Sequence, residues 1–591
     1  MHLTRPPRRS AERRRSSGPH APPGSLDRLV EARDKLRLAL VAADGIRRTA
    51  LARVRRSRLV RWRHRAPVAH ELLLAPPDLR PVDPCFADEV ASGSMGLAGL
   101  TVSLGEASPF AITPPSPGWA SELHGFGWLR HFAVTRTLEN EALARRLVQE
   151  WRALPRRHHA AAWAPEAVGR RVLSWLAHAG LLLNGAGRRE HAGLLRSLED
   201  QTGVLAATWR DAAEGYPRLL TLIALVQSCL CIGGHERRLD AAQKALVAEL
   251  TRQILDDGGH LSRNPATLVT ALLDLLPLPQ CFGARGLTPD PALASAIDRM
   301  TRMLRRLRLG DGQLARFNGM GATERDALAV VLAYHRGPDS EPPAVSASGY
   351  VRLQRGTTAV VVDAGAPPPL VLSGQACAGC LSFELSAGTQ MLLANGGVPV
   401  AAHERAMAAA RGTASHNTLV LGGKSSATLV RSASLRRRIG SAPIRQPDRV
   451  SCVLEESDGA VRLRASHDGY ASRFGLIHAR VLLLSADGLS LDGEDILEGS
   501  KGEIRLPHDL PVAVHFHLMP LAGARYGATQ HTAELMLPSG ACWRLTVTGA
   551  TLTIEAGTYF ADVLGPTNAQ QIVLRTVCQG ATRIRWRLEQ V

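Results

Sequence analysis

Two kinds of hydrophobic segment are missing from this chain of 591 residues. No run of about 18 apolar residues occurs, so the sequence predicts no membrane-spanning helix. The basic, proline-rich start does not lead into the roughly 7 to 15 apolar residues that a secretory signal requires. The protein is therefore either cytoplasmic, or exported by a route without such a signal, or translated from a different start.

Cysteines and aromatic residues are also few. The nine cysteines are odd in number and irregularly spaced, so we expect free, mostly buried thiols rather than a disulfide framework. Aromatic residues make up only 4% of the chain, whereas 45% hydrophobic and 21% charged residues are ordinary for a globular protein. The chain is longer than one core usually organises, so two large domains are expected.

The formal charge of +18 favours an anionic partner, such as an acidic polysaccharide, a lipid surface or nucleic acid. Much of this charge lies in residues 1–66, a basic extension that we expect to be partly disordered and partly helical. The arginines of residues 46–65 form either a solvated helix face or an attachment to an anionic membrane surface. Because no base-reading motif accompanies them, the sequence does not favour nucleic acid as a partner.

Three regions follow the basic extension. Residues 67–118 are rich in proline and contain only short strand-like pieces, as expected for a connecting segment. Residues 119–340 repeat apolar positions with helical spacing between Gly and Pro clusters, which predicts helices packed on helices. Residues 346–591 contain short β-rich segments separated by Gly, Asp and Pro, which predicts an antiparallel β-sandwich.

Residues 119–132 bring together aromatic side chains, histidines and an arginine, with Trp128 among them. Pyranose rings stack on tryptophan, and sugar hydroxyls pair with His and Arg donors. The span therefore suits a sugar groove in which Trp128 contacts the substrate. A well-packed helix start with internally bonded histidines explains the same residues equally well.

The most distinctive stretch is Arg411 to Val420, where His416 and Asn417 directly precede an apolar run. Residues 374–385 alternate like a half-buried strand, and the two stretches are candidates for neighbours in one sheet. The order Ser-His-Asn-Thr-Leu resembles the His-Asn-Thr signature of the heparinase II/III family of polysaccharide lyases. Weaker similarities to that family lie at residues 257–265, 317–321, 466–470 and 475–480 and at Trp586.

The resemblance covers most of residues 119–590 and implies an incomplete (α/α) toroid of helical hairpins followed by an antiparallel β-sandwich. It also implies cleavage of a uronate-containing acidic polysaccharide by β-elimination, without a cofactor, in the periplasm or cell envelope. In that reaction a donor neutralises the uronate carboxylate, a base removes the C5 proton, and an acid protonates the leaving oxygen.

Asn264 matches the neutralising asparagine of the family, and His416 is the candidate base or orienting group. Structural roles stay open for both residues, as an N-cap before Pro265 and as a strand histidine. Six further residues are expected to bind substrate, because they lie beside these two or in similar motifs: His260, Arg263, Trp128, Arg411, Asn417 and His467.

The chain departs from the family pattern at two places. Cys377 stands where many members carry a histidine, and the tyrosine expected beyond Asn264 falls near Phe317 and Asn318. Tyr216 and Tyr470 are the candidate substitutes for the acid. The departures motivate an alternative function, a non-catalytic cell-envelope protein of the same fold that binds acidic glycans or assists exopolysaccharide assembly.

No metal site is expected. Some relatives hold a structural metal with histidines and an aspartate, but no matching residues follow Cys377, and His416 alone cannot provide the usual four ligands. The spacing Cys377-Ala-Gly-Cys380 resembles a redox motif, but such motifs begin a helix, whereas this one lies among predicted strands.

Overall fold

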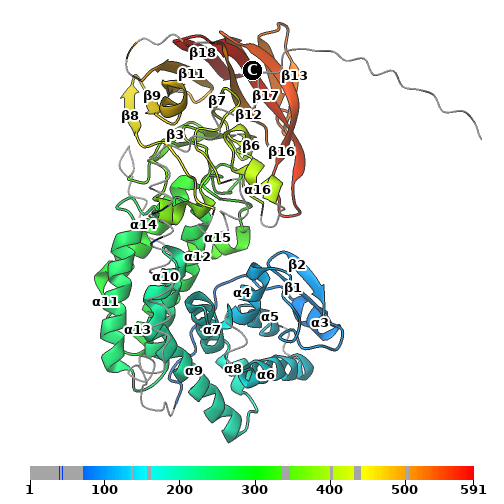
Figure 1. Cartoon of the computed structure of the whole chain (residues 1–591), viewed down its shortest axis with the longest axis vertical. Coiled ribbons are helices and arrows are strands. Elements are labelled where there is room, and N and C mark those ends of the chain that lie inside the picture. Colours follow the sequence, from blue (N-terminus) through cyan, green and yellow to red (C-terminus); the bar gives the residue numbers. More distant parts are fainter. Residues whose placement is uncertain are drawn as a thin grey trace, which may run out of the picture.

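The computed structural model describes residues 71–134, 137–155, 161–334, 347–399, 404–430, 441–500 and 508–591, with positions 39, 43, 502 and 506. Helices come first along the chain, and the strand-rich part caps one end of the helical part (Figure 1). The predicted fold, an incomplete toroid followed by a β-sandwich, is confirmed. Nearly all of residues 1–66 lie outside the described residues, so the expectations for the basic extension stay predictions.

The helical part has a short lead-in, made of α3 (Phe86–Ala91) and the hairpin β1 (Ser94–Leu97) and β2 (Leu100–Ser103). The main helices are α4 (Pro117–Gly125), α5 (Leu129–Phe132), α6 (Leu138–Ala153), α7 (Pro165–Ala177), α8 (Ala179–Leu183), α9 (Arg188–Thr208), α10 (Tyr216–Cys231), α11 (Glu236–Gln253), α12 (Pro265–Leu275), α13 (Pro277–Ala284), α14 (Pro291–Leu307) and α15 (Arg325–Tyr334). They form an open arc, with α4 to α6 on one side and α10, α11 and α14 on the other (Figure 1).

Local sequence determines where several helices begin. Side chains of Ser116, Thr137, Asn264 and Asp290 each accept a hydrogen bond from a backbone N–H in the first turn. Proline follows Ser116, Asn264 and Asp290, and its fixed φ suits the first helical position. Asn264 is therefore an N-cap, as one of its two readings predicted.

The centre of the helical core is α10, in which residues 219–231 are all buried. It packs against α7, α9, α11, α12 and α13, and an apolar surface on all sides is typical of such a helix. Within the described residues, Pro265–Ala284 is also apolar and long enough to cross a membrane by composition, but 67% of its most apolar window is buried in the protein. We therefore assign Pro265–Ala284 to the helical core.

Among its described residues, the β-domain contains three antiparallel sheets. The first has the order β3 (Tyr350–Arg355), β4 (Thr358–Asp363), β5 (Phe383–Ala387), β6 (Gln390–Leu393). The second is β16 (Thr551–Tyr559), β17 (Thr567–Cys578), β12 (Leu510–His517), β7 (Leu419–Leu421). The third is β13 (Gly523–Tyr526), β14 (Thr532–Met536), β15 (Cys542–Thr548), β18 (Thr582–Gln590), β11 (Ser490–Gly499), β10 (Leu476–Leu484), β9 (Ala460–His467), β8 (Val450–Ser457).

The strand expected at residues 374–385 is wrong over most of its length. A 3-10 helix ends at Gln375, and β5 begins only at Phe383, with its first four residues buried. The expected pairing is also wrong, because β5 and β7 belong to different sheets. Asn417 links the two sheets instead, since its Nδ2 donates to the Phe383 carbonyl and its Oδ1 accepts from the His517 N–H.

Two buried ion pairs join the helical part to the first sheet. Arg263, just before α12, lies 2.6 Å from the Asp363 carboxylate at the end of β4. Arg316, after α14, lies 3.2 Å from the Glu384 carboxylate in β5 and donates to the Tyr559 hydroxyl. The candidate site lies beside the first pair.

Candidate functional site

Asn264 stands at the boundary between the two domains. Its Oδ1 accepts from the Ala266 N–H at 3.0 Å, and its Nδ2 donates to Gln375 Oε1 at 2.9 Å. The residue is only 5% exposed. The protein itself therefore engages the amide oxygen and one of the two Nδ2 hydrogens that a lyase would present to a uronate.

The structure gives Arg263 an internal role. Its Nη2 pairs with Asp363, its Nε donates to the Ser348 carbonyl at 2.8 Å, and its Nη1 donates to the Gly365 carbonyl. Burial alone would lower the pKa of Arg263, but the Asp363 carboxylate raises it above its ordinary value. The predicted substrate contact by Arg263 is not supported, because its donors already have partners.

A tyrosine that the sequence argument missed lies beside this pair. The Tyr350 hydroxyl donates to the Arg263 carbonyl and accepts from Asn318 Nδ2 at 3.0 Å. Asn318 also donates to Asp363, so it takes a structural place where the family tyrosine was expected. Burial raises the pKa of Tyr350 well above its ordinary value, and the residue is 2% exposed.

Residues 375–379 connect the surroundings of Asn264 with those of His416. Gln375 binds Asn264, and the His416 ring lies so close to Gly379 that a Cβ there would be 2.5 Å from its Cδ2. Between them, burial raises the pKa of the Cys377 thiol to about 11, so the thiol is protonated near neutral pH. Cys377 therefore does not replace the base that the family histidine would supply.

His416 is 1% exposed, and its Nδ1 lies 2.8 Å from the Gly412 carbonyl. Because a carbonyl only accepts, the proton is on Nδ1 and the lone pair is on Nε2. Burial lowers the pKa of His416 below its ordinary value. The tautomer suits a base, but the ring is enclosed.

The other residues expected near His416 have structural partners. Arg411 donates to the carbonyls of Ala376 and Ser441, both at 2.9 Å, and Asn417 links two sheets. Neither residue is exposed by more than 6%. The predicted substrate contacts by Arg411 and Asn417 are therefore not supported.

His467 and Tyr470 lie in the core of the β-domain. His467 Nε2 lies 3.2 Å from His478 Nδ1, and His478 in turn lies 2.8 Å from the Asp495 carboxylate. The Tyr470 hydroxyl donates to the Leu419 carbonyl at 2.8 Å. Each is 1% exposed, so the structure does not support His467 as a substrate contact or Tyr470 as the acid.

His260 and Trp128 are also internal. Nδ1 of His260 accepts a hydrogen bond from the Ser262 N–H, and its Nε2 lies 2.9 Å from Gln253 Oε1. Burial lowers the pKa of His260 to about 4. Trp128 is 2% exposed and donates its indole N–H to the Leu123 carbonyl. The helix-start reading of residues 119–132 therefore fits Trp128 better than a stacking role.

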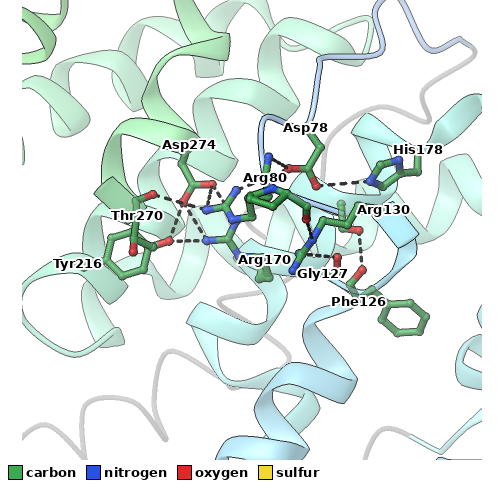
Figure 2. Close-up of polar contacts among 12 residues, drawn as sticks. Asp78, Arg80, Phe126, Gly127, Arg130, Arg170, His178, Tyr216, Thr270 and Asp274 are labelled. Atoms are coloured by element: carbon green, nitrogen blue, oxygen red, sulfur yellow. Dashed lines mark hydrogen bonds and ion pairs between the residues drawn. The ribbon is translucent and has the colours of Figure 1, made fainter. Parts of the chain in front are cut away.

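Tyr216 belongs to an ion-pair cluster inside the helical arc (Figure 2). The Asp274 carboxylate accepts from the Tyr216 hydroxyl at 2.6 Å and from Arg170 at 2.7 and 2.8 Å. Arg80 lies 2.7 Å from the same carboxylate. Burial raises the pKa of Tyr216 well above its ordinary value, so it is a poor proton donor.

A cleft of about 600 Å³ lies beside this cluster. It is bounded by the β1–β2 hairpin, α5 and α12, and by residues 314–324. Its charged lining is Arg80, Arg130, Arg170, Asp83, Glu122 and Glu324, so the formal charges cancel. His131 also lines it, and burial lowers the pKa of His131 to about 4, so the ring is neutral near pH 7.

Asn264 and His416 do not line this cleft, although Ala266 and Met320, close to Asn264, do. Within the described part of the chain, no group of three or more His, Cys, Asp or Glu side chains is arranged to hold a metal ion.

Known proteins with this fold include polysaccharide lyases. The chain has a TM-score of 0.67 to heparinase III, at 14% identity over 92% of this chain and 89% of that one. It has a TM-score of 0.61 to a mutant of heparan sulfate lyase HepC from Pedobacter heparinus, at 16% identity over 94% and 88%. At these identities the likeness concerns the fold.

Sequence comparison identifies the family. Residues 337–587 match the family described as heparinase II/III-like, C-terminal. The chain is also 32% identical over 528 residues to FtsZ-localized protein C of Caulobacter vibrioides, covering 87% of this chain and 89% of that protein. The chain belongs to the heparinase II/III-like family.

Proposed function

We propose that this chain is a non-catalytic binding protein that uses the lyase fold as a scaffold. The observation that carries the proposal is the state of Asn264, whose side chain caps α12 and binds Gln375 across the domain boundary. Only the second hydrogen of Nδ2 is left for a uronate carboxylate, and the residue is only 5% exposed, so Asn264 is poorly placed to neutralise one.

The candidate base and acid for β-elimination are also poorly suited to their roles. The protonated Cys377 thiol stands in place of a histidine, and the Tyr216 and Tyr350 hydroxyls are committed to Asp274 and to the Arg263 carbonyl. A base and an acid must both reach the substrate for general acid–base catalysis. These arrangements support the absence of turnover.

The charge of the cleft also favours this proposal over polymer cleavage. Its three guanidinium groups are matched by three carboxylates, and a polyanion gains little from a cleft without net positive charge. The identity to FtsZ-localized protein C over most of both chains motivates a more specific proposal, that this chain also localises with FtsZ. The basic residues 1–66 are then available to hold the assembly at an anionic membrane surface.

Two measurements test the proposal. Purified full-length protein, incubated with heparan, chondroitin, alginate and bacterial acidic exopolysaccharides, should produce no absorbance from unsaturated uronates. A fluorescent fusion expressed at its native level should coincide with labelled FtsZ. Product from any of these polymers contradicts the non-catalytic assignment, and a diffuse or periplasmic distribution contradicts the localisation.

The second candidate is an active lyase of the periplasm or cell envelope that cleaves an acidic polysaccharide. His416 favours it, because its Nδ1 bond to the Gly412 carbonyl leaves a basic lone pair on Nε2. In this candidate, Asn264 leaves Gln375 to bind the uronate, and Tyr216 leaves Asp274 to act as acid. Turnover that is lost in His416→Ala, with thermal stability retained, would establish this candidate.

A further inference from the structure

One arginine in the helical arc makes no direct ion pair with a carboxylate of the described residues. Arg80, Arg130 and Arg170 converge where the 71–83 segment crosses the arc, together with the carboxylates of Asp78 and Asp274 (Figure 2). Arg80 and Arg170 both pair with Asp274. Arg130 has no carboxylate within ion-pairing distance among the described residues, so its charge is balanced only by carboxylates that do not contact it, such as Glu122.

The contacts of Arg130 fix its position without neutralising it. Its Nε donates to the Pro81 carbonyl at 3.0 Å and its Nη1 to the Gly127 carbonyl at 2.7 Å. Burial lowers the pKa of Arg130, and the neighbouring Arg80 and Arg170 lower it further, against attraction from Asp78 and Glu122. A partly desolvated cation of this kind is stabilised by an anion that supplies the missing charge.

Arg130 lines the cleft of about 600 Å³ and keeps one nitrogen, Nη2, without a hydrogen bond among the described residues. Beyond the arginines, the lining includes apolar side chains of Leu97, Leu273, Leu314 and Met320. Binding sites of roughly 300 to 1,000 Å³ commonly combine an apolar lining with a few orienting polar groups.

We propose that this end of the cleft binds one carboxylate of a peptide segment from a partner protein, with Arg130 as its main contact. Arg170 and Arg80 flank the carboxylate, and apolar side chains next to it in the peptide fill the remaining cleft. The inference rests on the proposed function, because it assigns the cleft to a protein partner that is bound and released unchanged.

The lining distinguishes such a peptide from an acidic polysaccharide. A polyanion places further negative charges along the cleft, where Asp83, Glu122 and Glu324 oppose them. A peptide with a single acidic residue among apolar ones avoids this repulsion and buries apolar surface. Trp128 also lines the cleft, but it is only 2% exposed, no more than Met320, so it does not by itself distinguish the two ligands.

Affinity selection from a phage-displayed library of random peptides on the full-length protein tests the proposal. Selected peptides should carry Asp or Glu at one fixed position between apolar residues. Changing that residue to Asn or Gln should weaken binding at least tenfold. The proposal is overturned if no peptides are enriched, if no acidic position emerges, or if a hexuronate tetramer displaces the peptides at equal concentration.

Variants of Arg130 complete the test. Arg130→Gln should weaken the selected peptide at least tenfold, and Arg130→Lys should retain more affinity because it keeps the charge. The matched control is Arg145→Gln on α6, since Arg145 also donates to a backbone carbonyl, that of Asn184, but lies outside the cleft. Equal binding by wild type and Arg130→Gln, with unchanged melting temperatures, contradicts the proposal. Absorbance from unsaturated uronates is a separate measurement, and a positive result there would contradict the proposed non-catalytic function rather than the peptide site alone.

Discussion

The buried pair of Arg263 and Asp363 should control how firmly the two domains are joined. The perturbation is Asp363→Ala, which removes the carboxylate 2.6 Å from Arg263 Nη2 and 3.1 Å from Asn318 Nδ2. Arg263 then keeps its carbonyl partners but loses its counter-charge in a position that is 6% exposed. Removing one partner of a buried ion pair costs about 3 to 5 kcal/mol.

The control is an exposed pair in the third sheet. Arg587 lies 3.0 Å from Asp492, with side chains that are 48% and 39% exposed. Asp492→Ala should therefore change the free energy of unfolding by less than about 1 kcal/mol. The double variant Arg263→Met, Asp363→Ala should be more stable than Asp363→Ala alone, because no unpaired charge remains buried.

Urea unfolding, followed by circular dichroism and by tryptophan fluorescence, measures these effects. We expect Asp363→Ala to lower the transition midpoint and to separate the transitions that the two probes report, because the pair spans the domain boundary. A loss no larger than that of Asp492→Ala, with coincident transitions, would refute the reasoning that this pair holds the domains together.

Further predictions concern acid stability, the basic extension and Cys377. Burial lowers the pKa of His260 to about 4 from an ordinary 6.5, so its stabilising contribution is complete above pH 6.5 and is lost as the pH falls towards 4. Between pH 7.5 and pH 4.5, the wild type should lose about 2.5 kcal/mol more unfolding free energy than His260→Gln, because the variant has no buried imidazole to protonate. Urea midpoints that fall equally in both proteins would contradict this. Deleting residues 1–66 should abolish binding to anionic vesicles, at about 1 kcal/mol per basic residue near the surface, without changing peptide selection by the cleft. Equal vesicle binding by both forms would exclude the membrane role. Cys377→His should not by itself produce uronate cleavage, because Asn264 and Tyr350 stay engaged, and measurable product from this variant would contradict that reasoning.

The sequence was sufficient to predict the domain order because the spacing of apolar residues differs between the two halves of the chain. Apolar spacing predicted helices over residues 119–340, where α10 and α14 lie, and short β-rich segments predicted strands over residues 346–591, where β9 and β15 lie. The alternation was misleading at residues 374–385, where the end of a 3-10 helix and a loop precede β5. Alternation over so short a stretch does not by itself separate a strand from a buried loop.

The candidate site was harder to predict because its contacts join distant parts of the chain. Asn264 was identified from its motif, but its partner Gln375 lies 111 residues away. Arg263 was expected to bind substrate because it lies next to Asn264, and no local feature marks its actual partner, Asp363, 100 residues further on. The Arg130 site depends on three separate segments meeting in the arc, and no sequence motif marks that meeting.

The most direct test of the central claim compares wild type with Asn264→Ala in one experiment that records both thermal stability and uronate product. We predict that the variant loses roughly 1 kcal/mol or more of stability, because it loses a helix cap and the bond to Gln375, and that neither protein releases product. Product from wild type that disappears in Asn264→Ala, with an unchanged melting temperature, would contradict the account and establish Asn264 as a catalytic residue.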